Sequence, residues 1–207
     1  MKTHFDSIAQ DWDNDYRIKR AKIIAEKIKS SVPFNKNDKV LDYGCGTGLI
    51  SFNLLDVVGS ITFIDNSDEM LSIINNKIKL LYEEIDYLIN NDIFSNTHSL
   101  EIFDCIYTSM VLHHVVDIDS LGIRFNQLLK KNGILCIVDL TTDDGTFHMN
   151  EPGFNGYNGF DPLALSNRLK KYGFIEQKRE IFFSDTKQKN GKNISYSLFI
   201  LNMKRDT

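Results

Sequence analysis

A short apolar strand that leads into an acidic residue and a glycine-rich turn is the feature that most limits how this chain can fold. Val40 and Leu41 precede Asp42, and the segment that follows is Tyr43-Gly44-Cys45-Gly46-Thr47-Gly48. Glycines let the backbone follow a tight path and come close to a ligand. The pattern also predicts a helix over 49–55, whose free N–H groups would lie beside that ligand. By itself the turn indicates a nucleotide-like ligand.

Short apolar strands alternate with amphipathic helices along most of the chain, a pattern typical of a parallel sheet covered by helices on both faces. The helices are expected over 17–30, 68–81 and about 121–129, the last one stopped by Asn132-Gly133. The strands are expected over 39–43, 60–65, 85–89, 103–108, 134–139, 174–183 and 194–203. The last two strands are joined by polar residues 184–193 and are close enough in sequence for an antiparallel hairpin.

Length and composition favour one domain over residues 1–207. The formal net charge of −4 gives no electrostatic footprint for nucleic acid or an anionic membrane. Three widely spaced cysteines, Cys45, Cys105 and Cys136, are typical of reduced thiols. The beginning of the chain lacks the blocks of a signal peptide, and its apolar stretches are shorter than a membrane span. We therefore expect a cytoplasmic protein with neither a nucleic-acid nor a membrane partner.

A segment rich in glycine, asparagine, aspartate and aromatic residues, 141–161, is too long for a plain connection in a compact domain. Such a loop is either a functional lid or disordered. Asp161-Pro162 has the chemistry of an N-cap followed by proline at the first helical position, so a helix is expected from Pro162 to a stop at Gly173.

The spacing of the glycines separates two classes of nucleotide-binding protein. A dinucleotide fingerprint requires glycine at the sixth position counted from Gly44, and Leu49 occupies that position. The segment instead resembles the first motif of the class I S-adenosylmethionine (SAM)-dependent methyltransferases, which is an acidic residue, any residue and then Gly-x-Gly-x-Gly. The resemblance continues in three segments, namely Ile61-Thr62-Phe63-Ile64-Asp65, Asn91-Asp92-Ile93 and the stretch from Ser109 to His114.

This resemblance implies an α/β fold of the Rossmann-like three-layer type, in which a mostly parallel seven-stranded sheet ends in a C-terminal antiparallel hairpin. It divides the chain into N-terminal lid helices (1–31), a SAM-binding core (38–140), an acceptor-side loop (141–161) and a C-terminal helix and hairpin (162–207). The lid expectation rests on the likeness of Phe5-Asp6, Ala9, Trp12-Asp13 and Arg17 to the first helix of small-molecule members.

The resemblance also implies SAM as the cofactor. Asp42 would attract its ammonium group, Asp65 would accept hydrogen bonds from the ribose, and Asp92 would accept one from the adenine amine. Arg17 is expected at the carboxylate and Trp12 at the sulfonium. The full set of expected cofactor contacts is Trp12, Arg17, Asp42, Gly44, Cys45, Gly46, Gly48, Asp65, Asn66, Met70, Asp92, Ile93 and Ser109.

Methyl transfer needs in-line placement more than covalent help, because the sulfonium is already a good leaving group. Where the acceptor is a hydroxyl or a protonated amine, His113, His114 or His148 is the candidate base. The sequence shows no cluster of histidine or cysteine ligands and no acidic residue directly after the strand at 103–108, so no metal is expected.

Three functions remain open on the sequence alone. The leading one is a SAM-dependent methyltransferase with a small-molecule acceptor, and the second is a non-catalytic protein that binds SAM for regulation. The third is a nicotinamide-dependent oxidoreductase. The chain lacks the Asn-Pro-Pro-aromatic and Pro-Cys signatures, which disfavours amide, adenine and cysteine-dependent pyrimidine methylation.

Overall fold

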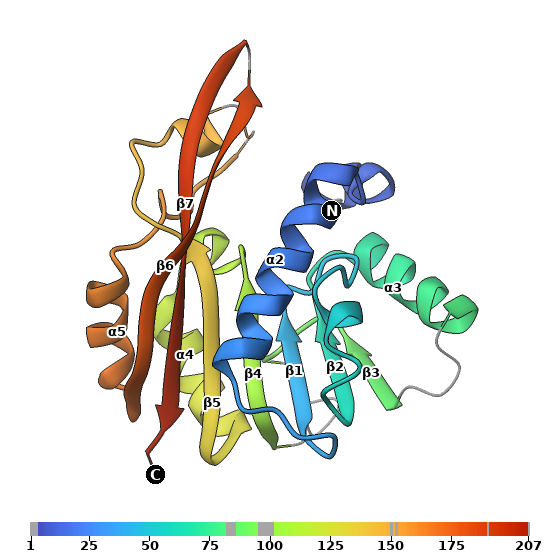
Figure 1. Cartoon of the computed structure of the whole chain (residues 1–207), viewed down its shortest axis with the longest axis vertical. Helices are drawn as coiled ribbons and strands as arrows, with labels where there is room; N and C mark the ends of the chain where they lie inside the picture. Colours follow the sequence, from blue (N-terminus) through green and yellow to red (C-terminus); the bar gives the residue numbers. More distant parts are fainter. Residues whose placement is uncertain are drawn as a thin grey trace. The chain divides into compact units, whose positions relative to one another are not determined.

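The computed structural model describes residues 4–81, 86–94, 102–149, 151, 153–189 and 191–206. Within these residues the strands are β1 (Lys39–Tyr43), β2 (Ser60–Ile64), β3 (Asp86–Asn90), β4 (Phe103–Ser109), β5 (Leu129–Leu140), β6 (Phe174–Lys189) and β7 (Lys192–Arg205). They form a seven-stranded sheet in the order β3-β2-β1-β4-β5-β7-β6 (Figure 1). The β1–β2 and β2–β3 pairs are parallel, whereas β7 is antiparallel to both β5 and β6. The predicted fold class is confirmed.

The chain divides into two compact units, the first ending at Tyr107 and the second beginning at Thr108. The helices of the first are α1 (His4–Ile8), the 3-10 helix η1 (Ala9–Asp11), α2 (Asp15–Ser31), the 3-10 helix η2 (Ser51–Asn53) and α3 (Asp68–Leu81). Those of the second are the 3-10 helix η3 (Leu112–His114), α4 (Ile118–Leu128), the 3-10 helix η4 (Thr146–His148) and α5 (Pro162–Lys170). Whether the two units act as the single expected domain stays a prediction.

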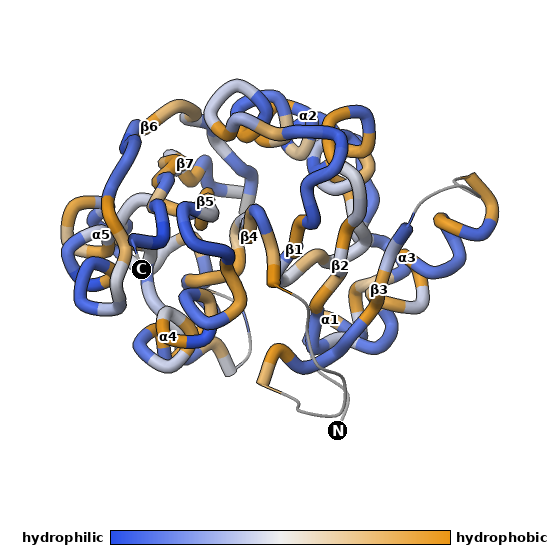
Figure 2. The backbone as a smooth tube through the Cα atoms, turned by 90° about the horizontal axis from the view of Figure 1, so that it is seen from below, coloured by the Kyte–Doolittle hydropathy of each residue, from blue (hydrophilic) through white to orange (hydrophobic). Residues whose placement is uncertain are grey.

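In the first unit, polar side chains start the two long helices. Asn14 caps α2 by accepting from the Arg17 N–H at 3.0 Å, and the Ser67 hydroxyl accepts from the Met70 N–H at 3.2 Å at the start of α3. Figure 2 shows hydrophobic stretches along β1 and β2, while α2 alternates between hydrophilic and hydrophobic residues. Its buried residues are Ala21, Ile24, Ala25 and Ile28. This is the apolar stripe that the helical periodicity predicts.

In the second unit, α4 and α5 pack against each other beside the C-terminal strands. Gly122 permits the approach, since a Cβ there would lie 3.0 Å from the Tyr172 ring. The long hairpin of β6 and β7 is drawn in red in Figure 1, and the predicted antiparallel pairing is confirmed. The predicted polar connection 184–193 is wrong, because pairing continues from Ser184↔Ser197 to Lys189↔Lys192.

Two further predictions about helices are wrong. Only the short η2 replaces the helix expected over 49–55, since the Asn53 side chain donates to the Leu49 carbonyl at 2.8 Å while the Asn53 N–H turns to Ile50. An α-helix would give the Leu49 carbonyl to the Asn53 N–H. The helix before β5 ends at Leu128, and Asn132 has a φ of +64° inside β5 rather than at a helix stop.

No helix among the described residues is both long and apolar enough to cross a membrane. The cytoplasmic location stays a prediction.

The N-cap of α5 gives a test of the local folding rules. The Asp161 carboxylate accepts from the Ala164 N–H at 2.7 Å, as the Asp-Pro pattern predicts. We expect Asp161→Ala to lower the free energy of unfolding by about 1 kcal/mol, the usual cost of losing such a cap. Urea denaturation measures the change, and Asp161→Ser, which keeps an acceptor, is the matched control. Equal losses in the two variants would contradict the capping role.

Candidate functional site

The glycine loop lies between β1 and η2 and turns back toward the end of β2. Gly44, Gly46 and Gly48 have φ angles of +74°, +53° and +80°, a region that side chains disfavour. The N–H groups of Gly44 and Cys45 both donate to the Ile64 carbonyl, at 2.7 and 3.0 Å. A Cβ on Gly48 would lie 2.7 Å from the Phe52 ring. The glycines are therefore required by the backbone path and by the close packing that follows it.

Asp65 connects this loop to the start of α3. One carboxylate oxygen accepts from the Gly46 N–H at 2.8 Å, and the other accepts from the Ser67 N–H at 2.9 Å. Burial raises the pKa of Asp65, although these two hydrogen bonds oppose the shift. A carboxylate has about four acceptor positions, so lone pairs remain for the hydroxyls of a ligand. The residue expected to hold the ribose thus also holds the loop in shape.

Asp42 is buried at the carboxyl end of β1, with 3% of its surface exposed. One oxygen accepts from the Ser51 hydroxyl at 2.7 Å and from the Tyr107 hydroxyl at 2.8 Å. Burial raises the pKa of Asp42 to about 7, and the nearby negative charge of Asp65 adds to the shift. At neutral pH this carboxyl is poised between its neutral and charged forms, and a cation beside it would favour the charged form.

The carboxylates predicted for ribose and adenine both lie near one phenol. The pKa of Tyr43 is raised to about 12, chiefly by burial and then by the charges of Asp65 and Asp92. Asp92 itself is exposed and accepts from the Phe94 N–H at 2.8 Å. The structure therefore brings these two predicted residues into one neighbourhood, after β2 and β3.

The N-terminal segment is joined to the glycine loop by a charged group. Lys77 of α3 contacts the Asp13 carboxylate at 2.5 Å and donates to the Thr47 carbonyl at 2.8 Å, while the Thr47 hydroxyl donates to Asp13. The Trp12 indole nitrogen is 3.7 Å from the position of a Cβ on Gly46. The expected lid segment thus lies directly beside the loop.

Arg17 contacts the tryptophan of the same segment. Its guanidinium carbon is 4.1 Å from the centre of the Trp12 ring, and it donates to the Trp12 carbonyl at 3.2 Å. Burial lowers the pKa of Arg17. The structure therefore places Arg17 and Trp12 together. Their predicted contacts with a cofactor stay predictions.

The other expected cofactor residues differ in exposure. Asn66 is exposed, whereas Met70 and Ile93 are only 1% and 2% exposed and belong to the core of the first unit. Burial raises the pKa of the Cys45 thiol, and the charges of Asp42 and Asp65 raise it further. Cys45 is therefore a neutral, buried residue of the loop.

The second unit holds the histidines proposed as bases. His113 is 1% exposed, and its Nδ1 lies 2.5 Å from the carboxylate of Asp139, which is itself fully buried. The same carboxylate accepts from the His113 backbone N–H at 3.3 Å and from the Leu140 N–H at 2.7 Å. This pairing leaves the Nε2 of His113 as the atom that faces away from the carboxylate. An imidazole held in this way is suited to accept a proton or bind a metal.

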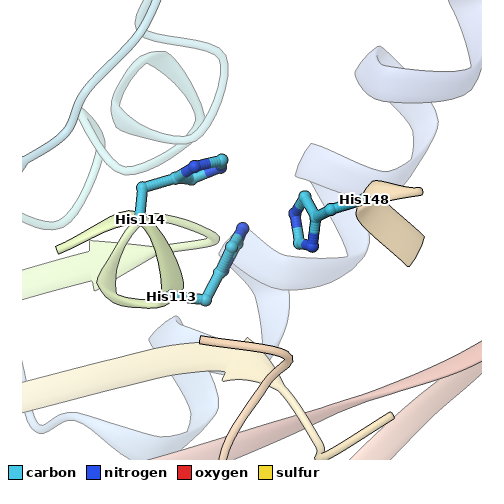
Figure 3. Close-up of side chains that lie close together, drawn as sticks. All are labelled: His113, His114 and His148. Carbon is cyan, nitrogen blue, oxygen red and sulfur yellow. The ribbon is translucent and has the colours of Figure 1, made fainter. Parts of the chain in front are cut away.

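Three histidines converge in this unit, so the expectation that the chain has no histidine cluster is wrong. His113, His114 and His148 each offer one ligand atom, and these atoms lie within 4.8 Å of one another (Figure 3). His113 and His114 are neighbours in η3, whereas His148 comes from η4, more than thirty residues later in the sequence. Sequence spacing does not reveal this cluster, because the chain folds back to form it.

Close backbone packing fixes the acceptor-side loop against η3. The Tyr157 N–H donates to the His113 carbonyl at 2.7 Å, and a Cβ on Gly156 would lie 2.0 Å from that carbonyl oxygen. On the strand side, Met110 has a φ of +59°, a strained conformation for a side chain of this size. Ser109, expected at the cofactor, has a buried hydroxyl with no hydrogen-bond partner among the described residues.

Several residues of the site carry no signal in the sequence. Ser51 and Tyr107 hold Asp42 but belong to no motif, and Lys77 is a single charge among many. Asp139 differs from these residues, because it lies at the carboxyl end of an apolar strand, as Asp42 does.

Burial of Asp42 predicts a pH-dependent cost to folding. Its folded pKa of about 7 exceeds the value near 3.9 of an unfolded carboxyl, so the folded chain loses stability as pH rises between these values. Asp42→Asn removes this cost and keeps an oxygen for Ser51 and Tyr107. We expect the ligand-free variant to gain about 2 to 3 kcal/mol over the parent between pH 5 and pH 8, at about 1.4 kcal/mol per pKa unit.

Urea denaturation at both pH values measures this gain. Asp56→Asn is the control, because Asp56 is exposed and its pKa is lowered by a hydrogen bond from Lys29. The control variant should show no gain at pH 8. Parallel pH profiles for Asp42→Asn and the parent chain would overturn the assignment.

Comparison with known proteins identifies the family. The model of the methyltransferase domain family matches residues 16–180. An uncharacterized methyltransferase of Schizosaccharomyces pombe is 32% identical over 146 residues, which are 63% of this chain and 51% of that protein. The ubiquinone biosynthesis O-methyltransferase of Pelagibacter ubique is 33% identical over 151 residues, or 66% of this chain and 62% of that protein. The chain thus matches about half to three fifths of the length of these relatives.

A solved structure shows the same fold. The structure of a SAM dependent methyltransferase from Aquifex aeolicus superposes with a TM-score of 0.73 at 17% sequence identity, covering 97% of this chain and 98% of that one. At this identity the likeness concerns the fold alone. Together with the family match, it shows that the chain belongs to the methyltransferase domain family and has the class I fold of the SAM-dependent methyltransferases.

Proposed function

We propose that this chain transfers the methyl group of SAM to a small-molecule acceptor. The observation that carries the proposal is the position of Asp65, whose carboxylate holds the glycine loop through Gly46 and still has acceptor capacity for the two ribose hydroxyls. This is the arrangement that the family resemblance predicts, and the family match agrees with it. Apart from Ser109, the residues expected to contact the cofactor belong to the first unit.

Each charged or polar group of SAM has a suitable partner in this site. Asp42 meets the ammonium group, whose positive charge offsets the cost of ionising a buried carboxyl. Asp92 accepts from the adenine amine, and the Trp12 face receives the sulfonium. Arg17 reaches the carboxylate of the methionine portion. The ammonium and carboxylate lie at one end of SAM and the adenine at the other, so these partners fix the direction in which the cofactor binds.

The histidine cluster, which follows the carboxyl ends of β4 and β5, serves the acceptor. Ligands of open α/β sheets bind beyond these strand ends. The acceptor oxygen or nitrogen forms a bond to the methyl carbon while the carbon–sulfur bond breaks, and its electron pair stays on sulfur as S-adenosylhomocysteine forms. The acceptor proton passes to Nε2 of His113, whose Nδ1 is held by Asp139. His114 and His148 complete the polar surface of the cluster.

A small acceptor fits the charge of the chain and the name of one relative. The net charge of −4 provides no attraction for nucleic acid. The Pelagibacter relative is named for O-methylation in ubiquinone biosynthesis, and this supports an acceptor with a hydroxyl group.

The direct test of the proposal is calorimetric titration with SAM, followed by detection of S-adenosylhomocysteine with a panel of hydroxyl and amine acceptors. Binding and product formation support the proposal. Binding without turnover on the whole panel favours a non-catalytic SAM-binding protein. Binding of NADH in place of SAM favours an oxidoreductase.

Substitution of Asp65 tests the cofactor site. Asp65→Ala should weaken SAM binding by roughly 1 to 3 kcal/mol, because it removes hydrogen bonds to a charged group. Asp65→Asn should weaken it less, since an amide oxygen still accepts from the Gly46 N–H. Asp56→Asn removes an exposed carboxylate and should bind SAM as the parent does. Unchanged affinity in a folded Asp65→Ala variant contradicts the ribose assignment.

Substitution in the dyad tests the acceptor side. Asp139→Asn leaves a shape similar to the carboxylate but no negative charge to stabilise protonated His113. We expect kcat to fall by about 10²-fold or more, while the affinity for SAM changes little. His113→Asn should lose a similar factor, and its kcat should lose the pH dependence of an essential base. If both variants retain the parent kcat in the methyl-transfer assay, the histidine does not act as the base.

A further inference from the structure

The histidine cluster of the second unit has the composition and the supporting contacts of a metal site. The ring centre of His113 lies 4.2 Å from that of His114 and 4.8 Å from that of His148. The ring centres of His114 and His148 are 5.3 Å apart. Figure 3 shows the three imidazoles pointing toward a common point from two separate segments. Their ligand atoms already lie within 4.8 Å of one another. Tetrahedral nitrogen ligands of a zinc ion are about 3.4 Å apart, given Zn–N bonds of about 2.1 Å. The ligand atoms must therefore approach one another by up to about 1.4 Å to reach this geometry.

The first ligand is already oriented. Protein imidazoles that bind a metal usually donate their second ring N–H to a carboxylate, which fixes the tautomer and makes the free nitrogen more basic. Asp139 does this for His113, at 2.5 Å from Nδ1, and it is itself held by two backbone N–H groups. The Nε2 of His113 therefore has its lone pair available to an ion.

Two carboxylates provide the charge that a divalent cation requires. The carboxylate of Asp139 contacts Nδ1 of His113. The carboxylate of Glu151 lies 3.7 Å from Nδ1 of His114 and 3.9 Å from Nε2 of His148. Three neutral imidazoles and two carboxylates together offset a charge of +2.

The cluster is fixed by packing on one side and open on another. His148 is 5% exposed and stacks on Phe154, with ring centres 4.0 Å apart and planes 5° apart. The side chain of His114 is 23% exposed, so an ion or a ligand has a way in. Buried support and one exposed member are the features of a metal site that keeps an open position.

We propose that His113, His114 and His148 bind one divalent transition-metal ion of the first row, such as zinc or cobalt, with the nearby Glu151 carboxylate offsetting part of its charge. Imidazole nitrogens favour these ions, whereas magnesium and calcium prefer oxygen ligands. The role of the ion rests on the proposed function. An acceptor hydroxyl bound at the open position of the ion would lose its proton to water. Nε2 of His113 would then be a ligand of the ion rather than the base. Binding itself does not depend on that role.

Titration of the untagged chain with Co²⁺ tests this site. After dialysis against a chelator, we expect one equivalent of Co²⁺ to bind per chain and give visible absorption bands. Mg²⁺ and Ca²⁺ should produce no change in thermal stability, whereas Zn²⁺ should raise the melting temperature and compete with Co²⁺.

Variants of the cluster locate the ion. His114→Asn and His148→Phe should abolish binding of one equivalent of Co²⁺, and the phenyl ring of the second keeps the stack on Phe154. Asp139→Asn should weaken binding by about 10- to 100-fold, the usual effect of losing an outer carboxylate. His4→Asn is the matched control, because His4 is an exposed histidine of the N-terminal helix. It should bind Co²⁺ as the parent does.

Two results would overturn the metal site. One is a parent chain that binds no Co²⁺ at a ratio of one to one, and the other is unchanged binding in both His114→Asn and His148→Phe. Titration of the same samples with SAM separates this inference from the proposed function, and circular dichroism confirms that the variants are folded. SAM binding without Co²⁺ binding removes only the metal site, and Co²⁺ binding without SAM binding removes only the proposed function.

Discussion

The hydrogen bonds from Gly46 and Ser67 to Asp65 are the contacts on which the candidate cofactor site of the first unit depends. The glycine loop has no regular secondary structure after β1, and three of its residues have positive φ angles. Its path is set by two N–H groups directed at the Ile64 carbonyl and by one directed at the next residue, Asp65. The carboxyl end of β2 thus holds the loop in its conformation through these hydrogen bonds. Any change that moves this strand end also moves the surface offered to a ligand.

The same region shows how a binding site costs stability. Asp42 is buried where its charged form is unfavourable, and its two hydroxyl donors only partly offset that cost. A chain selected only for stability would place a neutral residue there. The buried carboxyl of Asp42 lies near a second one, Asp65, so a positively charged ligand beside them favours their ionised forms.

The sequence predicted the parts of the fold that depend on local pattern. Strand β1 and helix α3 have the predicted bounds, because apolar periodicity and capping residues act over a few neighbours. The helix over 49–55 failed because one side chain, Asn53, takes the carbonyl that a helical N–H would need. The hairpin was predicted too short. Polar residues on a two-stranded ribbon form strand pairs as well as apolar residues do, but they show no alternation of apolar and polar residues in the sequence.

The candidate site also contains residues that the sequence pattern predicted and residues that it did not. Asp42, Asp65 and the glycines follow strands directly, so a motif finds them and the structure places them together. The histidine cluster depends instead on Gly156, whose missing side chain allows the acceptor-side loop to rest on the His113 carbonyl. That contact joins segments more than forty residues apart in the sequence, and no local rule indicates it. The histidine cluster is assembled only by the fold and lies near the strained backbone of Met110. Sequence patterns are least informative about such a cluster, and chemistry specific to this chain is most to be expected there.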